Sequence, residues 1–200
     1  MANDIQQVRF AAALIAGGRS RRMGSDKAFL PWEGQPLWEH QMGKLRALRA
    51  PQLLLSCRRE QAFPALPGIT QVADRWPDAG PLGGVGSCLE ICQEPYLVVL
   101  GIDLPLLPVS FLQQLVDECA SGCGAVVMED SGGYYEPLAA VYPKSMSSLA
   151  AEQIAAGRFS MQEFITRGVD GGLLRAPAMA IKKAWFTNVN TPEDLPSRDA

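Results

Sequence analysis

The stretch from Phe10 to Leu30, FAAALIAGGRSRRMGSDKAFL, places the strongest constraint on what this chain can fold into. It starts with an apolar run, Phe10 to Ile15, which predicts a buried strand. The run leads to Gly17 and Gly18, where the missing Cβ lets the backbone turn sharply and approach a ligand. A cationic loop follows, in which one acidic residue offsets four basic ones: Asp26, and Arg19, Arg21, Arg22 and Lys27. A solvated basic loop is the alternative, but this density of cations favours a phosphate-binding loop.

Two common phosphate-binding motifs do not fit this loop. The motif G-x-x-x-x-G-K-[ST] fails because Lys27 follows Asp26 and precedes Ala28. The motif G-x-G-x-x-G fails because residues 19–22 occupy the positions where further glycines would stand. The loop therefore follows a longer pattern, AGGRSRRMGSDK.

Apolar and amphipathic segments alternate along the chain, and this alternation predicts an α/β fold with a mostly parallel sheet. We expect one domain over the 200 residues. Strands are expected at about 9–15, 52–57, 69–73, 96–102, 124–129, 134–142 and 184–189. Helices are expected from Pro36 to about 48, from about 81, around 112–119, at 144–156, at 160–168, and in a short stretch capped by Thr191 and Pro192. Pro137 predicts that its strand is an edge strand or is bulged.

Composition and charge exclude several classes of function. Hydrophobic residues make up 48% of the chain and charged residues 20%, which is ordinary for a soluble globular protein. A pI near 5.2 gives little support to a nucleic-acid partner. Apolar runs are too short for a membrane span. The start, MANDIQQVRF, lacks the features of a secretory signal, so the cytoplasm is the expected location.

Cysteines and histidine offer little catalytic chemistry. The five cysteines are an odd number, and their spacing favours buried reduced thiols over a zinc site. His40 is the only histidine, and a lone histidine on a predicted helix is more often a surface or packing residue. A Ser-His-Asp site or a histidine-rich metal site is therefore excluded.

Asp103 directly follows the most apolar run of the chain, Tyr96 to Ile102. Such a run predicts a central strand that is covered on both faces. In open α/β sheets, ligands bind outside the carboxyl ends of the strands. A carboxylate at that place can hold Mg²⁺ against phosphate oxygens, and a turn or helix-cap aspartate is the alternative.

A second glycine-rich segment, Gly80 to Gly84, precedes a predicted helix face with Val85, Cys88, Leu89 and Cys92. A glycine-rich helix start allows close approach of a ligand. A loop with flexible glycines explains the same residues equally well, so both interpretations stay open at this point.

The loop AGGRSRRMGSDK closely resembles the signature loop of the nucleotidyltransferases with a Rossmann-like fold, and most of all that of the molybdenum cofactor guanylyltransferases. Four further segments resemble this family in the same order: GPLGG at 80–84, IDLP at 102–105, YEPLAAVY at 135–142 and NVNTPED at 188–194. The resemblance implies a three-layer Rossmann-like fold with helices on both faces of the sheet. It also implies transfer of GMP from GTP to the molybdenum-molybdopterin cofactor, with Mg²⁺ as the required metal and pyrophosphate as the second product.

The resemblance further implies roles for individual residues, in a nucleotide-binding half at about 9–105 and an acceptor-binding half at about 106–195. The nucleotide would be bound by Ile15, Ala16, Gly17, Gly18, Arg19, Lys27, Ser56, Asp74 and Asp103. Catalysis would depend on Arg22, Lys27 and Asp103, of which Asp103 would also bind Mg²⁺. The acceptor would be bound by Glu136, Asn188 and Asn190. Lys27 is expected in a loop, so that Lys27→Ala would leave the fold intact.

One departure from the family keeps alternatives open. The guanylyltransferases often have asparagine after the second strand, where this chain has Ser56, and a hydroxyl cannot reproduce the hydrogen bonds of an amide. A related enzyme that uses CTP or a sugar-phosphate acceptor, and a nucleotide-binding module without turnover, remain alternatives.

The expected partners are GTP, molybdenum-molybdopterin and proteins of cofactor delivery, without nucleic acid or membrane. The expected state is a monomer or weak homo-oligomer. The acceptor phosphate is already an anion, so the reaction needs no protein base.

Overall fold

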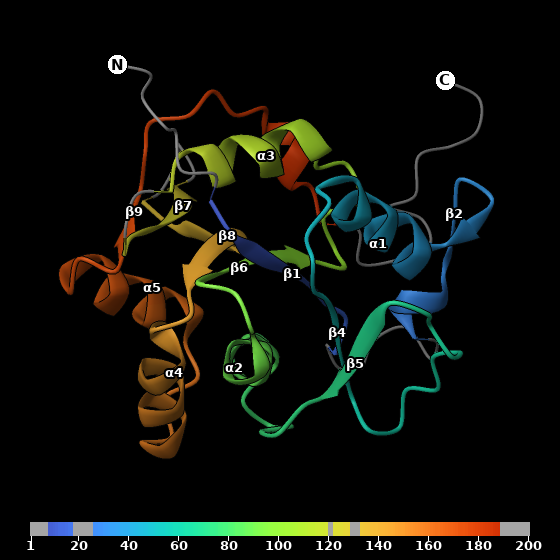
Figure 1. Cartoon of the computed structure of the whole chain (residues 1–200), viewed down its shortest axis with the longest axis horizontal. Coiled ribbons are helices and arrows are strands. Elements are labelled where there is room, and N and C mark those ends of the chain that lie inside the picture. The colour runs from blue at the N-terminus through green and yellow to red at the C-terminus, as the bar shows by residue number, and fades with distance from the viewer. Residues whose placement is uncertain (1–7, 18–25, 120–121, 129–132, 189–200) are drawn as a thin grey trace.

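A computed structural model describes residues 8–17, 26–119, 122–128 and 133–188, and the structural statements below concern these residues. A seven-stranded sheet has the order β5-β4-β1-β6-β8-β7-β9 (Figure 1). Its strands are β1 (Phe10–Ile15), β4 (Leu53–Cys57), β5 (Ile69–Ala73), β6 (Tyr96–Gly101), β7 (Gly124–Met128), β8 (Tyr135–Pro143) and β9 (Leu174–Arg175). Strand β8 runs antiparallel to both neighbours, and the other neighbouring pairs are parallel. The predicted, mostly parallel α/β sheet is confirmed.

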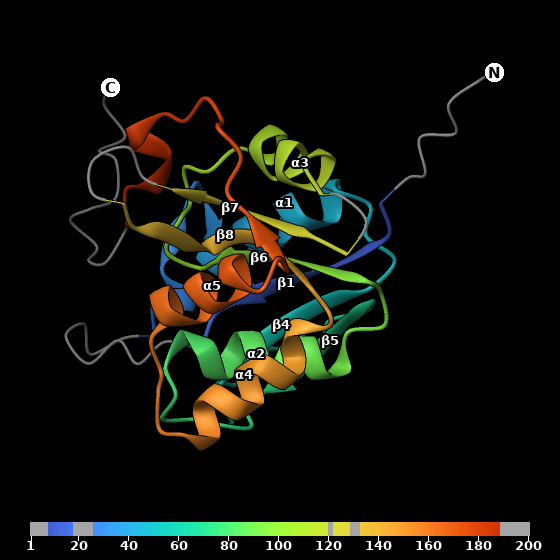
Figure 2. The same ribbon diagram turned by 90° about the vertical axis from the view of Figure 1, so that its left-hand side faces the viewer.

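Helices cover both faces of this sheet, which makes three layers (Figures 1 and 2). On one face lie α1 (Leu37–Ala47) and α3 (Val109–Asp117), with two 3-10 helices, η1 (Lys27–Phe29) and η2 (Lys183–Phe186). On the other face lie α2 (Pro81–Ile91), α4 (Met146–Ala155) and α5 (Met161–Asp170). A small separate hairpin, β2 (Pro31–Trp32) and β3 (Gln35–Pro36), precedes α1. None of these described helices has the length and apolarity needed to cross a membrane.

Side-chain alternation in β1 explains why this strand occupies the centre of the sheet. Ala12 and Leu14 pack in the cluster beneath α1 and α3, whereas Ala11, Ala13 and Ile15 pack in the cluster beneath α2 and α4. Residues 11–15 are all buried, and so is every residue of β6. A strand that is apolar on both faces can lie only between two helical layers, as expected for a parallel sheet.

The expectation for Pro137 is half right. The strand that contains it, β8, lies between β6 and β7, so the edge position is wrong. The bulge is confirmed, because Val126 pairs with Ala140 whereas Met128 pairs with Tyr135, which leaves extra residues of β8 around Pro137. A bulge accommodates a residue that has no N–H to give to the ladder.

The strand expected at 184–189 is wrong. Residues 183–186 form η2, and the rings of Trp185 and Phe186 lie 5.5 and 5.6 Å from that of Phe111 on α3. These apolar side chains pack against α3 and do not form a strand. The edge strand of the sheet is instead β9, whose two residues are too few to give a sequence signal. Helix α1 also begins one residue later than expected, because Pro36 is its N-cap. The helix expected after Thr191 lies outside the described residues.

His40 and three of the five cysteines have packing roles, as predicted, whereas Cys119 and Cys123 are only partly buried. The five cysteines are free thiols, and burial raises the pKa of Cys57, Cys88 and Cys92. His40 on α1 lies against the ring of Trp32, and its Nε2 is 3.4 Å from the Pro105 carbonyl oxygen. Burial lowers the pKa of His40, which is consistent with a neutral packing residue.

Candidate nucleotide-binding site

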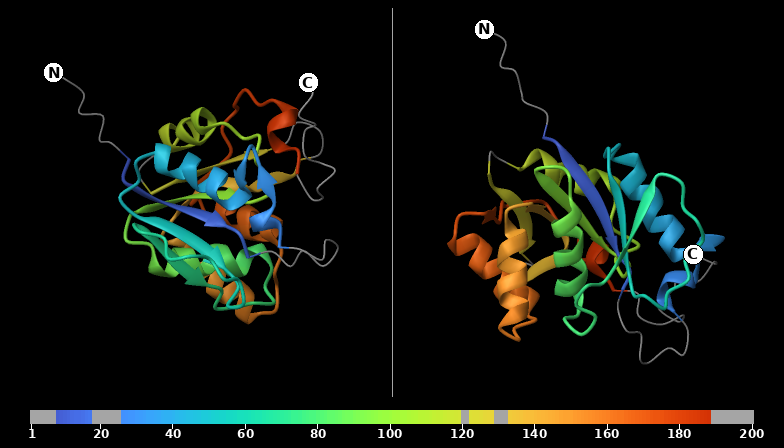
Figure 3. Two further views of the ribbon diagram at one scale, coloured as in Figure 1. Left: turned by 90° about the vertical axis from the view of Figure 1, so that its right-hand side faces the viewer. Right: turned by 60° about the horizontal axis from the view of Figure 1, so that its bottom comes forward.

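The carboxyl ends of β5, β4, β1 and β6 meet at one edge of the sheet, because these four strands are parallel neighbours. The chain leaves β1 through α1 on one face, and it enters β6 through α2 on the other face (Figure 3). The strand order therefore reverses between β1 and β6. Such a switch point leaves a crevice in which α/β proteins bind ligands. The residues that follow these strands are the candidate site.

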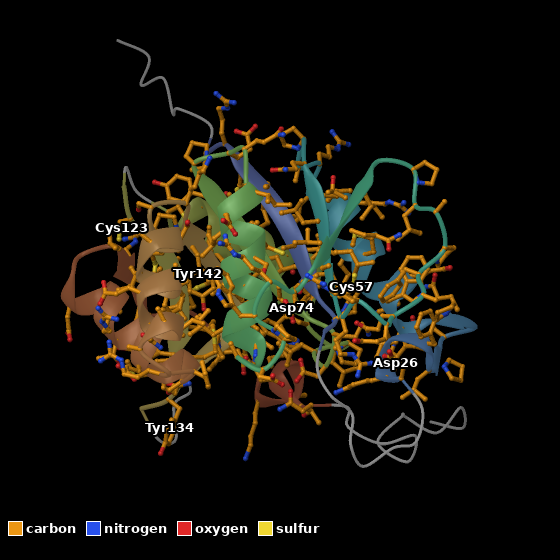
Figure 4. All side chains as sticks on the ribbon, turned by 90° about the horizontal axis from the view of Figure 1, so that it is seen from below. Asp26, Cys57, Asp74, Cys123, Tyr134 and Tyr142 are labelled. Atoms are coloured by element: carbon orange, nitrogen blue, oxygen red, sulfur yellow. The ribbon has the colours of Figure 1, made fainter. Side chains whose placement is uncertain are left out.

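Asp74, directly after β5, is the most enclosed carboxylate of the candidate site (Figure 4). Only 6% of the residue is exposed, and its Oδ1 accepts a hydrogen bond from Ser56 Oγ at 3.4 Å. Ser56 itself is completely buried in β4. The resemblance named both residues as nucleotide ligands, and the structure brings them into contact.

Two glycines let the backbone pack closely against this pair, and a third, Gly83, packs against Trp76. A Cβ on Gly17 would lie 3.1 Å from Asp74 Oδ2, and a Cβ on Gly84 would lie 2.6 Å from Ser56 Oγ. A Cβ on Gly83 would lie 2.4 Å from the Trp76 carbonyl oxygen. Gly83 and Gly84 belong to the first turns of α2, so the alternative of a flexible glycine loop is wrong for them. They are glycines because α2 begins in contact with the ends of β4 and β5.

Burial determines the electrostatics of Asp74. Desolvation raises the pKa of this carboxyl to about 6, and the hydrogen bond from Ser56 lowers it by a smaller amount. A carboxylate that is ionised near neutral pH in a poorly solvated place is ready to accept hydrogen bonds from ligand N–H groups. Its desolvation is then offset by the ligand.

We expect Asp74→Asn to stabilise the nucleotide-free protein by about 2–3 kcal/mol at pH 7–8, since a pKa shift of one unit corresponds to about 1.4 kcal/mol. The pKa of Asp74 is raised on folding, so its contribution to stability is complete below the unfolded pKa of about 4. That contribution is lost as the pH rises through about 6. Asparagine stays neutral, and the gain should therefore vanish toward pH 4. Urea unfolding from pH 4 to 8 measures it, with the exposed Asp170→Asn as control. Parallel stability curves for Asp74→Asn and the parent would contradict this reading.

Lys27 does not lie in an open loop, which corrects the sequence expectation. It is the first residue of η1 and is only 8% exposed. Asp26 caps η1, because its Oδ1 accepts a hydrogen bond from the Ala28 N–H at 3.1 Å. Asp26 Oδ2 is also 2.8 Å from the guanidinium of Arg58, which follows β4. The ion pair brings the start of η1 beside the carboxyl end of β4. Lys27, the first residue of η1, therefore lies there too. A change of Lys27 to alanine would also remove packing of its aliphatic chain.

Asp103 lies in a turn after β6 and has an unsatisfied acceptor. Its Oδ1 is buried and has no hydrogen-bond partner in the described part of the chain. Asp103 does not cap α3, whose N-cap is Pro108, so the cap alternative is wrong. A Cβ on Gly101 would lie 2.5 Å from Asp103 Oδ1, and the absence of that carbon lets the carboxylate fold back against β6.

A buried, unpaired carboxylate oxygen is a suitable ligand for Mg²⁺, a hard cation that prefers oxygen. Within the described ranges, three or more histidine, cysteine or acidic residues gather nowhere into a metal site. Mg²⁺ commonly binds through one or two carboxylates and takes its other ligands from substrate phosphates and water. The donor set around Asp103 fits this mode.

Of the remaining predicted residues, some lie at the same edge of the sheet and others lie outside the described residues. Ile15 ends β1 and faces Gly84, and Ala16 and Gly17 follow it at the same edge. Glu136 lies at the amino end of the antiparallel β8, which is also at this edge. Asn188 is exposed near the end of the described residues. Gly18, Arg19, Arg22 and Asn190 lie outside the described residues.

Sequence reasoning missed two residues beside this site, Arg58 and Gln61. Gln61 is 8% exposed, and its Nε2 donates to the Ala16 carbonyl oxygen at 3.0 Å. Its Oε1 accepts from the Arg58 backbone N–H at 2.7 Å. Both residues stand in a polar stretch after a strand, RREQ, which has the appearance of an ordinary surface turn. No spacing or motif distinguishes them.

Comparison with known proteins agrees with the fold. The family model of the MobA-like NTP transferase domain matches residues 12–170. A probable molybdenum cofactor guanylyltransferase from Opitutus terrae is 36% identical over 188 residues, which cover 92% of each chain. A molybdenum cofactor guanylyltransferase from Pseudomonas putida is 33% identical and covers 91% of this chain and 93% of its own. The crystal structure of molybdopterin-guanine dinucleotide biosynthesis protein A from Archaeoglobus fulgidus, at 22% identity, has the same fold, with a TM-score of 0.66 over 92% of this chain and 94% of its own. A chain matched this way over most of its length belongs to the family of MobA-like nucleotidyltransferases.

Proposed function

We propose that this protein transfers GMP from GTP to the molybdenum-molybdopterin cofactor and releases pyrophosphate. The observation that carries the proposal is the 36% identity, over 92% of the chain, to a relative named as a probable molybdenum cofactor guanylyltransferase. The crevice between β1 and β6 supports it, because the nucleotide ligands expected from the sequence that the structure describes lie at that one edge of the sheet. Family membership supports a nucleotidyltransferase, and GTP, Mg²⁺ and the acceptor are the finer parts of the proposal.

In this proposal, the base of GTP lies against the end of β1 and reaches toward Asp74. The ring N–H and the amino group of guanine are both donors, and a carboxylate accepts from both. Ser56 already donates to Asp74, so the hydroxyl shares this carboxylate with the base. The missing side chains of Gly17 and Gly84 let the backbone approach Asp74 and Ser56 closely.

The reaction is a substitution at the α-phosphorus of GTP. An acceptor phosphate oxygen forms the new P–O bond, and the bond to the β-phosphate oxygen breaks, which releases pyrophosphate. The attacking oxygen is an anion at neutral pH, so the protein's task is to position the groups and to offset their negative charge. Lys27 supplies a cation beside the end of β4. Asp103 supplies a carboxylate at the end of β6. When bound at Asp103, Mg²⁺ would neutralise charge on the phosphate oxygens.

The acceptor would lie toward the second half of the chain, where Glu136, the second residue of β8, lies at the same edge. Glu136 Oε1 is 3.3 Å from the Leu138 N–H, so its carboxylate is held by its own strand. The roles of Glu136 and Asn188 toward the acceptor, a cytoplasmic location, and a monomeric or weakly associated state remain predictions from the sequence.

The second candidate is a cytidylyltransferase, and Ser56 in place of the expected asparagine is the observation that favours it. We nevertheless expect GTP to bind at least about tenfold more tightly than CTP, because a site that hydrogen-bonds one base leaves its polar groups unpaired with another. Calorimetric titration with GTP, CTP, ATP and UTP in the presence of Mg²⁺ measures this preference.

Tighter binding of CTP than of GTP would favour the cytidylyl alternative. Release of pyrophosphate on addition of molybdenum-molybdopterin distinguishes an enzyme from a nucleotide-binding module. A protein that binds GTP and releases no pyrophosphate with this acceptor would contradict the proposed reaction.

A further inference from the structure

The segment from Arg58 to Phe63 contacts the chain on both sides of the signature loop (residues 17–27). On the side where the loop begins, Gln61 Nε2 donates to the Ala16 carbonyl oxygen at 3.0 Å. The orientation of the Gln61 amide is fixed, because its other end accepts from the Arg58 N–H at 2.7 Å. A buried amide with partners at both ends holds the Ala16 peptide at a defined place.

On the side where the loop ends, the same segment holds η1 at two points. The Arg58 guanidinium donates to Asp26 Oδ2 at 2.8 Å, with 28% and 22% of the two side chains exposed. The ring centroid of Phe63 lies 5.0 Å from that of Phe29, the last residue of η1. Asp26 also caps η1 through Ala28. The ion pair is therefore coupled directly to the helix that carries Lys27.

We propose that Arg58 and Gln61 are positioning residues, which fix Lys27 relative to the Ala16–Gly17 backbone through Asp26 and Ala16. The proposal rests on the proposed function, in which Ala16 and Gly17 contact the nucleoside and Lys27 contacts the triphosphate. GTP must then meet both groups at once. Their separation is set by a third segment, which contacts Ala16 on one side and η1 on the other. Small errors in such a separation weaken binding and catalysis strongly.

A direct contact between Arg58 and the triphosphate is the competing explanation for any effect of this residue. The two explanations differ in what Asp26 does. If Arg58 positions η1, loss of the Asp26 charge breaks the clamp and weakens GTP binding. If Arg58 binds phosphate, loss of the Asp26 charge releases the guanidinium and strengthens GTP binding.

The test measures the GTP dissociation constant by calorimetry, and the melting temperature, for Arg58→Met, Asp26→Asn and the double variant. Asp26→Asn keeps an acceptor for the Ala28 N–H and removes the charge. We expect each single variant to bind GTP about tenfold more weakly, and the double variant to be no weaker than either single one. Arg58→Lys should recover part of the affinity. Gln61→Glu, which loses the donor to Ala16 but keeps the acceptor for Arg58, should also weaken GTP binding.

A matched control is Arg167→Met with Glu152→Gln. This ion pair between α5 and α4 has a similar length, 2.7 Å, and its arginine side chain is 29% exposed. Its loss should leave GTP affinity unchanged. Tighter GTP binding by Asp26→Asn would overturn the positioning role, and so would an unchanged dissociation constant with a lowered melting temperature. A parent protein that does not bind GTP would instead overturn the proposed function, and this proposal with it.

Discussion

Asp103→Asn should lower the rate of GMP transfer by a factor of about 10²–10³, because the side chain that fits Mg²⁺ at the end of β6 would lose its charge. The fold should survive, since Asp103 caps no helix and its Oδ1 makes no hydrogen bond within the described residues. Pyrophosphate release measured across a Mg²⁺ series should show partial recovery at high Mg²⁺.

The control for Asp103 is a cap that makes a demonstrable hydrogen bond. Ser160 caps α5 and accepts from the Glu163 N–H at 3.3 Å, so Ser160→Ala should lower stability by about 1 kcal/mol and leave transfer unchanged. Parental activity of Asp103→Asn at limiting Mg²⁺ would refute the metal assignment. If Asp103→Asn lowered the melting temperature as well as the transfer rate, Asp103 would have a structural role instead.

Lys27→Met should lower transfer by a factor of about 10²–10³ with little loss of stability, by the scale of single electrostatic contacts in active sites. Methionine keeps most of the buried aliphatic chain of Lys27 and removes its positive charge. Lys27→Ala should lose the same activity and should also melt at a lower temperature, because Lys27 is 8% exposed. Steady-state pyrophosphate release and thermal melts of both variants separate charge from packing.

Lys144→Met is the matched control for Lys27. Lys144 lies at the opposite edge of the sheet, where its backbone N–H donates to the Pro95 carbonyl oxygen at the start of β6. This variant should retain parental activity. Unchanged turnover in Lys27→Met would remove Lys27 from the catalytic residues.

The sequence was sufficient for the main features of the sheet, and the reasons are visible in β1 and β6. Both strands are apolar on both faces. A strand with this pattern must be covered on both faces, so it lies in the interior of a sheet between helical layers. Asp103 was predictable for the same reason, whereas Asp74 follows the partly exposed edge strand β5 and was expected only from the family resemblance. A polar residue directly after a buried strand must lie at the carboxyl edge, whatever the details of the loops.

The features that the sequence did not predict depend on tertiary contacts. The apolar residues of η2 have the composition of a strand. In the folded chain two of them pack against the Phe111 ring, and this contact favours a helical turn over a strand. Pro137 suggests an edge strand by its missing donor, and a bulge solves the same problem inside the sheet. Arg58 and Gln61 bond to Asp26 and Ala16, and no local pattern reveals partners that distant in sequence.

The position of β1 also determines when in the life of the chain a nucleotide site can exist. β1 is the first strand of the sheet to be synthesised, yet its two neighbours come later, and Phe10 pairs with Tyr96 on one of its sides. A growing polypeptide that has not yet released β6 from the ribosome has an open edge on β1 and lacks Asp103. Since pairing of distant segments is the slow part of folding, the two sides of the site come together only after β6 has paired with β1. The proposed nucleotide site therefore requires that residue 103 has been synthesised and that β6 has paired with β1.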